Sequence, residues 1–226
     1  MNLHWQEESA ADAAPRVPDD IADLNFRITC RLLPADHAWA LYRALSQALP
    51  WLDDEPRAAV HSIHGAESGN GWERPQRGSD EIHLSRRARL CLRLPRERFA
   101  DARALQGARL DVSGYEVRVG AANVRPLSSE TTLFSRHLPA PAAGGENAFL
   151  EQAAAQLAGA GVSASRMMGG RGHVIRTPER EIAVCSLMVS GLAFGDAVRL
   201  QQRGLGGEQK LGCGIFLPHK GIEAVA

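Results

Sequence analysis

The 226-residue sequence lacks the features that mark membrane-inserted, exported and zinc-scaffold proteins. No apolar run reaches about 18 residues, and the first stretch, MNLHWQEESAADAAPR, carries acids where a secretory signal carries bases. The four cysteines are far apart and form no CxxC pair, which argues against a zinc ribbon and a disulfide framework (Cys30, Cys91, Cys185 and Cys213). We therefore expect a protein of the reducing cytoplasm with no membrane partner.

The formal net charge of zero hides a segregation of charge along the chain. Residues 1–24 hold six acids against one base, whereas residues 74–125 hold twelve arginines against six acids. Arginine outnumbers lysine 24 to 2, and the codon bias of a GC-rich genome is enough to explain this excess. Codon bias does not explain why the arginines cluster in one segment. A basic segment is the usual electrostatic footprint of a polyanion partner.

The first half of the chain predicts one βαββαβ module after a flexible acidic tail, residues 1–22. Residues 24–32, LNFRITCRL, alternate apolar and polar side chains as a half-buried strand does. Residues 35–49 are rich in Ala and Leu at helical spacing and end at Pro50. The other expected elements of this module, residues 23–126, are strands at 59–64, 87–94 and 115–120, a long loop GAESGNGWERPQRGSDE, and a helix at 96–105.

The second half, residues 127–226, repeats this order of elements. We expect strands at 131–138, 173–176, 181–189 and 213–217, with helices at 147–157 and 195–203. The predicted fold class is α+β, with tandem ferredoxin-like (RRM-like, βαββαβ) modules and a glycine-rich loop near the C-terminus.

That glycine-rich loop, GLGGEQKLGCG, lies between the last helix and the last strand, and it contains Lys210 and five glycines (Gly204, Gly206, Gly207, Gly212 and Gly214). It matches neither a Walker A loop nor a dinucleotide fingerprint, because GxxxxGK[ST] is absent and no helix follows. Its glycines are also compatible with a flexible hairpin that avoids steric strain. Because Arg199, Arg203 and Lys210 are close in sequence, we expect phosphate contact.

The stretch SRRARLCLRLP carries Arg87, Arg89 and Arg93 on one face of a predicted strand. Such a row is suited to following a nucleic-acid backbone, although a solvated outer sheet face has the same pattern. Aromatic residues make up only 5% of the chain, so a sheet that stacks bases on its central strands is not supported.

Among the eight histidines, His37 stands out because it follows Asp36 in the first turn of the first predicted helix. Histidine transfers protons near neutral pH, so His37 is a candidate general acid or base, although a polar helix start with no role fits equally. His61 and His64 form an HxxH, which is poor metal-ligand spacing without a third ligand. We expect no metal site.

Three segments, LPADHAWALY (33–42), SRRARLCLRLP (85–95) and LMVSGLAFGDAVRLQQRGLGGEQKLGCGIFLP (187–218), resemble the CRISPR-associated endoribonucleases that process precursor CRISPR RNA, specifically the myxobacterial-type subfamily. The resemblance implies binding of the repeat stem-loop and one metal-independent, cofactor-free cut that leaves a 2′,3′-cyclic phosphate and a 5′-hydroxyl. It implies that His37 is the general acid or base, with His61 and His64 in reserve.

The same resemblance makes Tyr42 and Lys210 candidate helpers, but five helical residues turn Tyr42 about 140° from His37, which favours a packing role for Tyr42. The expected partners are precursor and mature CRISPR RNA, together with other subunits of a CRISPR effector complex. Further expected contacts with the RNA are Arg87, Arg89, Arg93, Arg199, Arg203, Gly206, Gly207, Lys210, Gly212 and Gly214.

Two other functions fit the same fold. One is a non-catalytic RNA-binding subunit of a CRISPR ribonucleoprotein, which would bind the repeat with or without His37. The other is a regulatory protein whose ferredoxin-like modules bind a small-molecule effector, and this function predicts no salt-dependent affinity for RNA.

Overall fold

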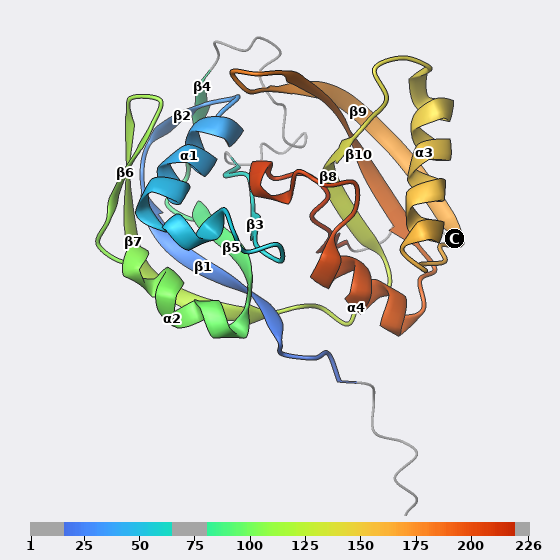
Figure 1. Ribbon diagram of the computed structural model, residues 1–226, viewed down its shortest axis with the longest axis horizontal. Coiled ribbons are helices and arrows are strands. Elements are labelled where there is room, and N and C mark those ends of the chain that lie inside the picture. Colours follow the sequence, from blue (N-terminus) through green and yellow to red (C-terminus); the bar gives the residue numbers. More distant parts are fainter. Residues whose placement is uncertain (1–15, 65–80, 220–226) are drawn as a thin grey trace, which may run out of the picture.

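The computed structural model describes residues 16–64 and 81–219, which form two modules side by side (Figure 1). The first module is built on a five-stranded antiparallel sheet of order β3-β5-β1-β7-β6. Its strands are β1 (Ile21–Thr29), β3 (Ala59–Val60), β5 (Arg89–Pro95), β6 (Arg109–Val112) and β7 (Tyr115–Pro126). Its helices are α1 (Ala38–Ala48) and α2 (Phe99–Ala102), with 3-10 turns η2 (Pro50–Leu52), η3 (Arg96–Arg98) and η4 (Arg103–Leu105).

The first strand differs from the sequence-based expectation at both ends. β1 starts at Ile21, so Ile21 and Ala22 belong to the sheet and not to the acidic tail predicted for residues 1–22. β1 ends at Thr29, and Leu32 belongs to a separate strand, β2 (Leu32–Pro34), which pairs with β4 (Glu81–His83). The predicted strand at 59–64 is reduced to β3, and the predicted loop lies, except for Glu81, outside the described residues.

The second module has a four-stranded antiparallel sheet of order β11-β8-β10-β9. Its elements are β8 (Leu133–Pro139), α3 (Gly145–Gly159), β9 (Arg166–Arg176), β10 (Glu181–Ser190), α4 (Phe194–Arg203), η5 (Gln209–Leu211) and β11 (Leu217–Pro218). The order of strands and helices in both modules confirms the predicted tandem ferredoxin-like fold. β9 begins seven residues earlier than expected, and only Leu217 and Pro218 form the last strand.

Each module has its own hydrophobic core, and a third apolar cluster joins them. Leu24, Phe26 and Leu45 are fully buried in the first core, and Phe149 and Leu187 in the second. In the third cluster, α1 of the first module packs on the sheet of the second and on η5 (Ala38, Trp39, Tyr42, Ile175, Ile182, Val184, Leu211 and Cys213). Helix α1 therefore lies at the junction of the two modules (Figure 1).

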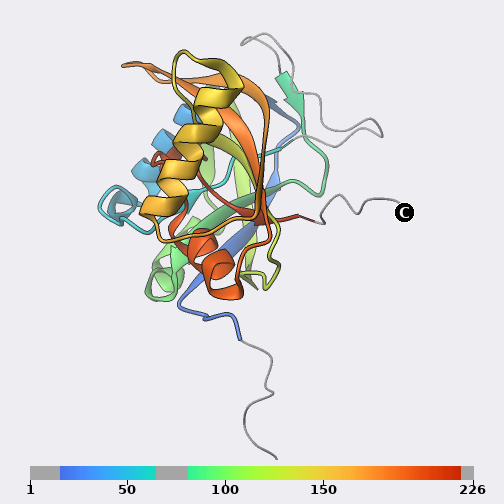
Figure 2. The same cartoon turned by 90° about the vertical axis from the view of Figure 1, so that its right-hand side faces the viewer.

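Seen from the side, α1 and α2 lie toward one edge of the molecule and β4 toward the opposite edge (Figure 2). Asp36, just before α1, ties that helix to β9, because its carboxylate accepts a hydrogen bond of 3.1 Å from the backbone N–H of Arg176. Within the described ranges, no helix has the length and apolar character needed to cross a lipid bilayer.

Candidate functional site

Histidines from both modules converge on one narrow cavity beside the start of α1. We call it the histidine cavity, and its lining includes His37 before α1, Ser62 and His64 after β3, and His137 on β8. Its volume is about 10 Å³, so it is a cleft between side chains and not a ligand-sized pocket. His173 on β9 lies against it, because the His137 and His173 rings are 4.5 Å apart between centroids.

His37 is held in place by the backbone. Its Nδ1 lies 2.8 Å from the carbonyl oxygen of Pro34, and its Nε2 accepts a hydrogen bond of 3.1 Å from the backbone N–H of Ile63. These two partners make Nδ1 the donor and Nε2 the acceptor of the ring. The side chain is buried, with 4% of the residue exposed. Through Ile63, His37 fixes the segment that carries His64.

The other three histidines form a row across the junction. The ring centroid of His64 lies 6.5 Å from that of His137, and the Ser62 hydroxyl lies 3.4 Å from Nδ1 of His137. His137 is 5% exposed, while His64 and His173 are half-buried. Sequence reasoning missed His137 and His173, since each is a single histidine on a strand with no motif around it.

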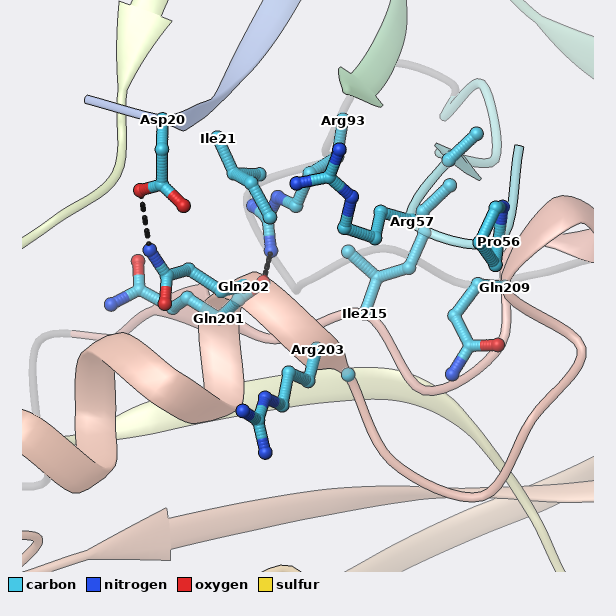
Figure 3. A pocket seen from close by; sticks show the side chains of 13 residues that line it. Asp20, Ile21, Pro56, Arg57, Arg93, Gln201, Gln202, Arg203, Gln209 and Ile215 are labelled. Atoms are coloured by element: carbon cyan, nitrogen blue, oxygen red, sulfur yellow. Dashed lines mark hydrogen bonds between the residues drawn. The ribbon is translucent and has the colours of Figure 1, made fainter. Parts of the chain in front are cut away.

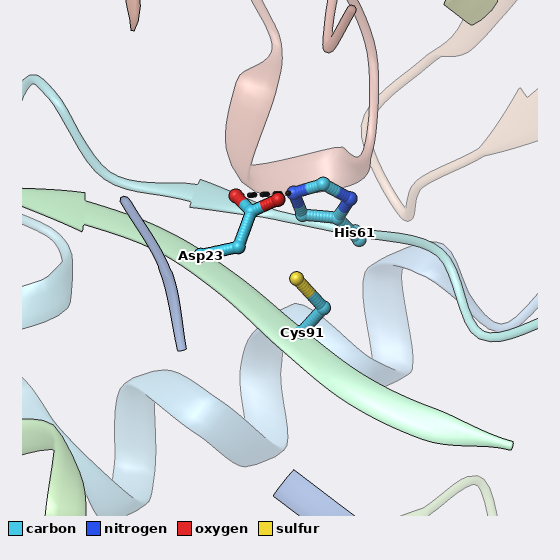
Figure 4. Close-up of side chains that lie close together, drawn as sticks. All are labelled: Asp23, His61 and Cys91. Atoms are coloured by element: carbon cyan, nitrogen blue, oxygen red, sulfur yellow. Dashed lines mark ion pairs between the residues drawn. The ribbon is translucent and has the colours of Figure 1, made fainter. Parts of the chain in front are cut away.

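The two histidines of the HxxH belong to different clusters. His61 points toward Asp23 on β1, with Nε2 3.4 Å from Oδ1, and the Cys91 thiol lies beside this pair (Figure 4). Arg93 already binds both carboxylate oxygens of Asp23, at 2.7 and 3.1 Å. A divalent cation here would face a guanidinium, so we interpret the cluster as an ion-pair network.

Titration of this network agrees with that interpretation. Burial raises the pKa of the Asp23 carboxyl, but the Arg93 guanidinium and His61 outweigh it and hold the pKa well below its ordinary value. Burial and the nearby Asp23 carboxylate raise the pKa of the Cys91 thiol well above its usual value. The network thus contains a carboxylate and a neutral thiol at neutral pH, and a neutral thiol is a poor metal ligand.

The structure corrects the expectation for Arg93. The residue is 2% exposed, and its Nη1 donates to the carbonyl oxygens of Gln201 and Phe216 in the second module at 2.8 and 2.9 Å. With the two bonds to Asp23, four of its five N–H groups are used. Arg93 therefore joins the modules and is not available to RNA.

The remaining predicted basic residues have different surroundings. Arg87 is exposed in the turn before β5, and Arg89 on β5 is half-buried and pairs across the sheet with Arg27 on β1. Arg199 donates to the carbonyl oxygen of Gly161 and to Asp196, at 2.7 and 2.9 Å. Arg203 is exposed and has no hydrogen-bond or ion-pair partner within residues 16–64 and 81–219. Arg87 and Arg203 are therefore the most exposed cations of the predicted set.

The glycine-rich loop is packed tightly, both on itself and against the first module. A Cβ on Gly214 would lie 1.8 Å from the carbonyl oxygen of Leu205, and one on Gly212 would lie 2.5 Å from the Ser62 hydroxyl. Both glycines have positive φ, which only glycine adopts without strain. Gly206 and Gly207 are exposed at the other end of the loop. Gly214 thus serves close packing within the loop and Gly212 close packing at the junction, while the end near Gly207 is open.

One predicted helper, Lys210, belongs to this loop, and the other, Tyr42, lies near it. Lys210 donates from Nζ to the carbonyl oxygen of Asp53, and the Tyr42 hydroxyl donates to the Asp53 carboxylate at 2.8 Å. The Ser46 hydroxyl donates to the same carboxylate at 2.6 Å and is the largest cause of its lowered pKa. Tyr42 also packs on the third apolar cluster. The structure thus places Tyr42 and Lys210 around Asp53, with none of the three among the residues that line the histidine cavity.

A larger cavity lies between the modules on the other side of the glycine-rich loop (Figure 3). Its volume is about 370 Å³, and its lining includes Arg57, Arg203, Gln202 and Gln209. The Gln202 amide donates to Asp20 at 2.8 Å. Guanidinium and amide groups around one opening are the groups that bind phosphate and ribose oxygens.

Comparisons with known proteins agree with this architecture. The sequence model of the family described as Cas6 Crispr matches residues 22–221. The CRISPR-associated endonuclease Cas6 of Myxococcus xanthus (strain DK1622) is 31% identical over 196 residues, which cover 87% of this chain and 80% of that protein.

Two solved structures share the fold. A structure titled "An RAMP protein binding different RNA substrates" superposes with a TM-score of 0.62 at 10% identity, covering 88% of this chain and 100% of that one. The product of a Cas6-related gene from Pyrococcus furiosus gives a TM-score of 0.61 at 9% identity, covering 88% and 99%. At such identities the likeness shows the fold alone. The family match and the M. xanthus relative show more, and this chain belongs to the Cas6 family.

Proposed function

We propose that this protein is a metal-independent endoribonuclease that binds the stem-loop of CRISPR repeat RNA and cuts the precursor to mature CRISPR RNA. The proposal is supported by membership of the Cas6 family and by the M. xanthus relative, which is named an endonuclease. The observation that carries it is the convergence of histidines from both modules on the histidine cavity.

The reaction proposed is attack of the ribose 2′-oxygen on the adjacent phosphorus. The 2′-hydroxyl loses its proton, the bond from phosphorus to the 5′-oxygen breaks, and the leaving 5′-oxygen gains a proton. The products are a 2′,3′-cyclic phosphate and a 5′-hydroxyl. This chemistry needs a base, an acid and positive charge near the phosphate, all of which histidines and arginines supply.

Within the cavity, the hydrogen bonds suggest a division of labour between His37 and His64. Proton transfer at Nε2 of His37 would break its bond with the Ile63 N–H, whereas His64 is half-buried at the edge of the cavity. We therefore assign proton transfer with the RNA to His64, the reserve candidate from the sequence. His37, the first candidate, becomes the positioning residue that holds the Ile63–His64 segment.

RNA binding is proposed for the exposed cations outside the buried network. Arg87 and Arg203 are exposed, and Arg89 is half-buried with its guanidinium bound to the carbonyl oxygens of Arg86 and Ala88. Each phosphate they neutralise releases counterions, so affinity falls as salt rises. Arg27 joins this group, because it pairs with Arg89 across β1 and β5 on the same face of the sheet.

The test of the function is cleavage of the repeat RNA from the protein's own CRISPR array in the presence of EDTA. We expect one cut, a cyclic phosphate on the new 3′ end, and no cut when the nucleotide 5′ of the scissile phosphate is 2′-deoxy. Cleavage of that deoxy RNA, or cleavage abolished by EDTA, would contradict the mechanism.

A second candidate function is a non-catalytic RNA-binding subunit of a CRISPR ribonucleoprotein. The backbone hydrogen bonds on both nitrogens of His37 favour it, because a histidine so bound has a structural role. It predicts tight, salt-dependent binding of the repeat without cleavage in any buffer.

A further inference from the structure

We propose that a second cleft, next to the histidine cavity, binds one unpaired RNA base by stacking on Trp39. The proposal rests on the proposed function, since it names a contact with the same RNA. The cleft has a volume of about 350 Å³ and lies among α1, the turn between β9 and β10, and η5. Its lining includes Trp39, Tyr42, Thr177, Arg180, Gln209 and Lys210. We call it the aromatic cleft.

Two aromatic rings form one wall of the aromatic cleft. Trp39 and Tyr42, one helical turn apart on α1, have ring centroids 5.6 Å apart at an interplanar angle of 54°. Both are half-buried, and they rest on the third apolar cluster, so their positions are fixed before a ligand arrives. Arg43 touches the Trp39 ring only at 5.9 Å, the outer limit of a cation–π contact, and yields its place at small cost.

The charges of the aromatic cleft favour a base over a phosphate. Arg180 is paired with Glu208, Lys210 is bound to a backbone carbonyl, and Glu179 adds a further negative charge. A phosphate would meet two carboxylates here, whereas a neutral base avoids that repulsion. Polar groups of the lining, including the Gln209 amide, can bond the edge of the base.

The position of the aromatic cleft links it to the proposed reaction. Trp39 is two residues from His37, and Ala38 and Ile175 line the histidine cavity while also packing with Trp39 in the third cluster. The two sites therefore border the same apolar cluster. A base that stacks on Trp39 therefore belongs to a nucleotide near the scissile phosphate. Its binding determines which phosphate of the RNA lies at the histidine cavity.

The test measures equilibrium binding of a repeat hairpin that carries a 2′-deoxy nucleotide at the cleavage position, so that binding is separated from cutting. Stacking on an aromatic side chain predicts a loss of affinity of about tenfold for Trp39→Ala, with most of it restored in Trp39→Phe. The matched control is Trp51→Ala. Trp51 is also half-buried beneath an arginine, Arg98, but is absent from the cleft.

An abasic scan of the unpaired nucleotides tests the proposal on the wild-type protein, with Trp39→Ala as the comparison. We expect one abasic position to cost wild type about tenfold and to cost Trp39→Ala nothing, with 2-aminopurine quenched at that position only. If the wild-type protein binds every abasic RNA equally tightly, no base stacks on Trp39 and the proposal for the aromatic cleft is wrong. That result would leave the proposed endoribonuclease activity unaffected. Failure of wild type to bind any repeat RNA would instead overturn the proposed function itself.

Discussion

Arg93 binds Asp23 through two parallel hydrogen bonds, Nε to Oδ1 at 2.7 Å and Nη2 to Oδ2 at 3.1 Å, and both residues are buried. The same guanidinium holds two backbone carbonyls of the second module. One side chain thus links two strands of the first sheet to the segments around α4 and β11. Because α1 also packs on both modules, the relative position of the modules is fixed where the histidine cavity lies.

Replacing Arg93 with methionine is expected to destabilise the fold strongly. It leaves the Asp23 carboxylate buried without its guanidinium, which typically costs about 3–5 kcal/mol of the free energy of unfolding. Urea unfolding at neutral pH measures the loss. Arg96→Met is the control, because Arg96 pairs with Asp19 at the surface, and such exposed pairs contribute about 0–1 kcal/mol. Equal losses in the two variants would contradict the role of Arg93.

The lowered pKa of Asp23 predicts a specific pH dependence of stability. A carboxyl whose pKa is lower in the folded state stabilises that state above its unfolded pKa of about 3.9, and the contribution is lost as pH falls toward the folded pKa. Between about pH 5 and pH 3, the free energy of unfolding of wild type should therefore fall more steeply than that of Asp23→Asn. Urea titrations across this range give the two slopes. Parallel slopes would show that Asp23 does not carry this effect.

Two alanine substitutions separate packing from backbone strain in the glycine-rich loop. Gly214→Ala places a Cβ 1.8 Å from the carbonyl oxygen of Leu205 in the same loop, so the two ends of the loop must move apart. In Gly207→Ala the new Cβ meets no atom within 4 Å. This substitution therefore lowers the free energy of unfolding only by the cost of a left-handed backbone at a residue with a side chain, about 1–2 kcal/mol. Thermal unfolding should show a much larger drop for Gly214→Ala. A drop of equal size in Gly207→Ala would mean that backbone strain alone explains these glycines.

Arg203→Ala is expected to weaken binding of the repeat hairpin in a salt-dependent manner. Losing one phosphate contact reduces the slope of log affinity against log salt by about 1. Filter binding at several salt concentrations measures that slope. Arg199→Ala is the matched control from the same helix, because Arg199 is already held by Gly161 and Asp196. An unchanged slope in Arg203→Ala would remove Arg203 from the RNA surface.

The sequence predicted the order of elements well because alternation and helix punctuation are local signals. The pattern of Arg89 and Arg93 correctly placed both on one face of β5, since their partners Arg27 and Asp23 also share a face of β1. The same pattern could not show that the second module covers the face of β5 that carries Arg93. That coverage depends on tertiary packing, which no local pattern records. The same limit applies to the histidine cavity, where Ser62 and His137 are 75 residues apart.

The central claim is that the histidine cavity carries the reaction, with His64 in contact with the RNA and His37 holding the segment before it. The most direct measurement is the single-turnover cleavage rate of repeat RNA by wild type, His64→Ala and His37→Gln, with hairpin affinity measured alongside. We predict a loss of roughly 100- to 10,000-fold for His64→Ala at unchanged affinity, and a much smaller loss for His37→Gln, whose amide can still accept from the Ile63 N–H. Full activity in His64→Ala together with none in His37→Gln would reverse the assignment, and full activity in both would contradict the site.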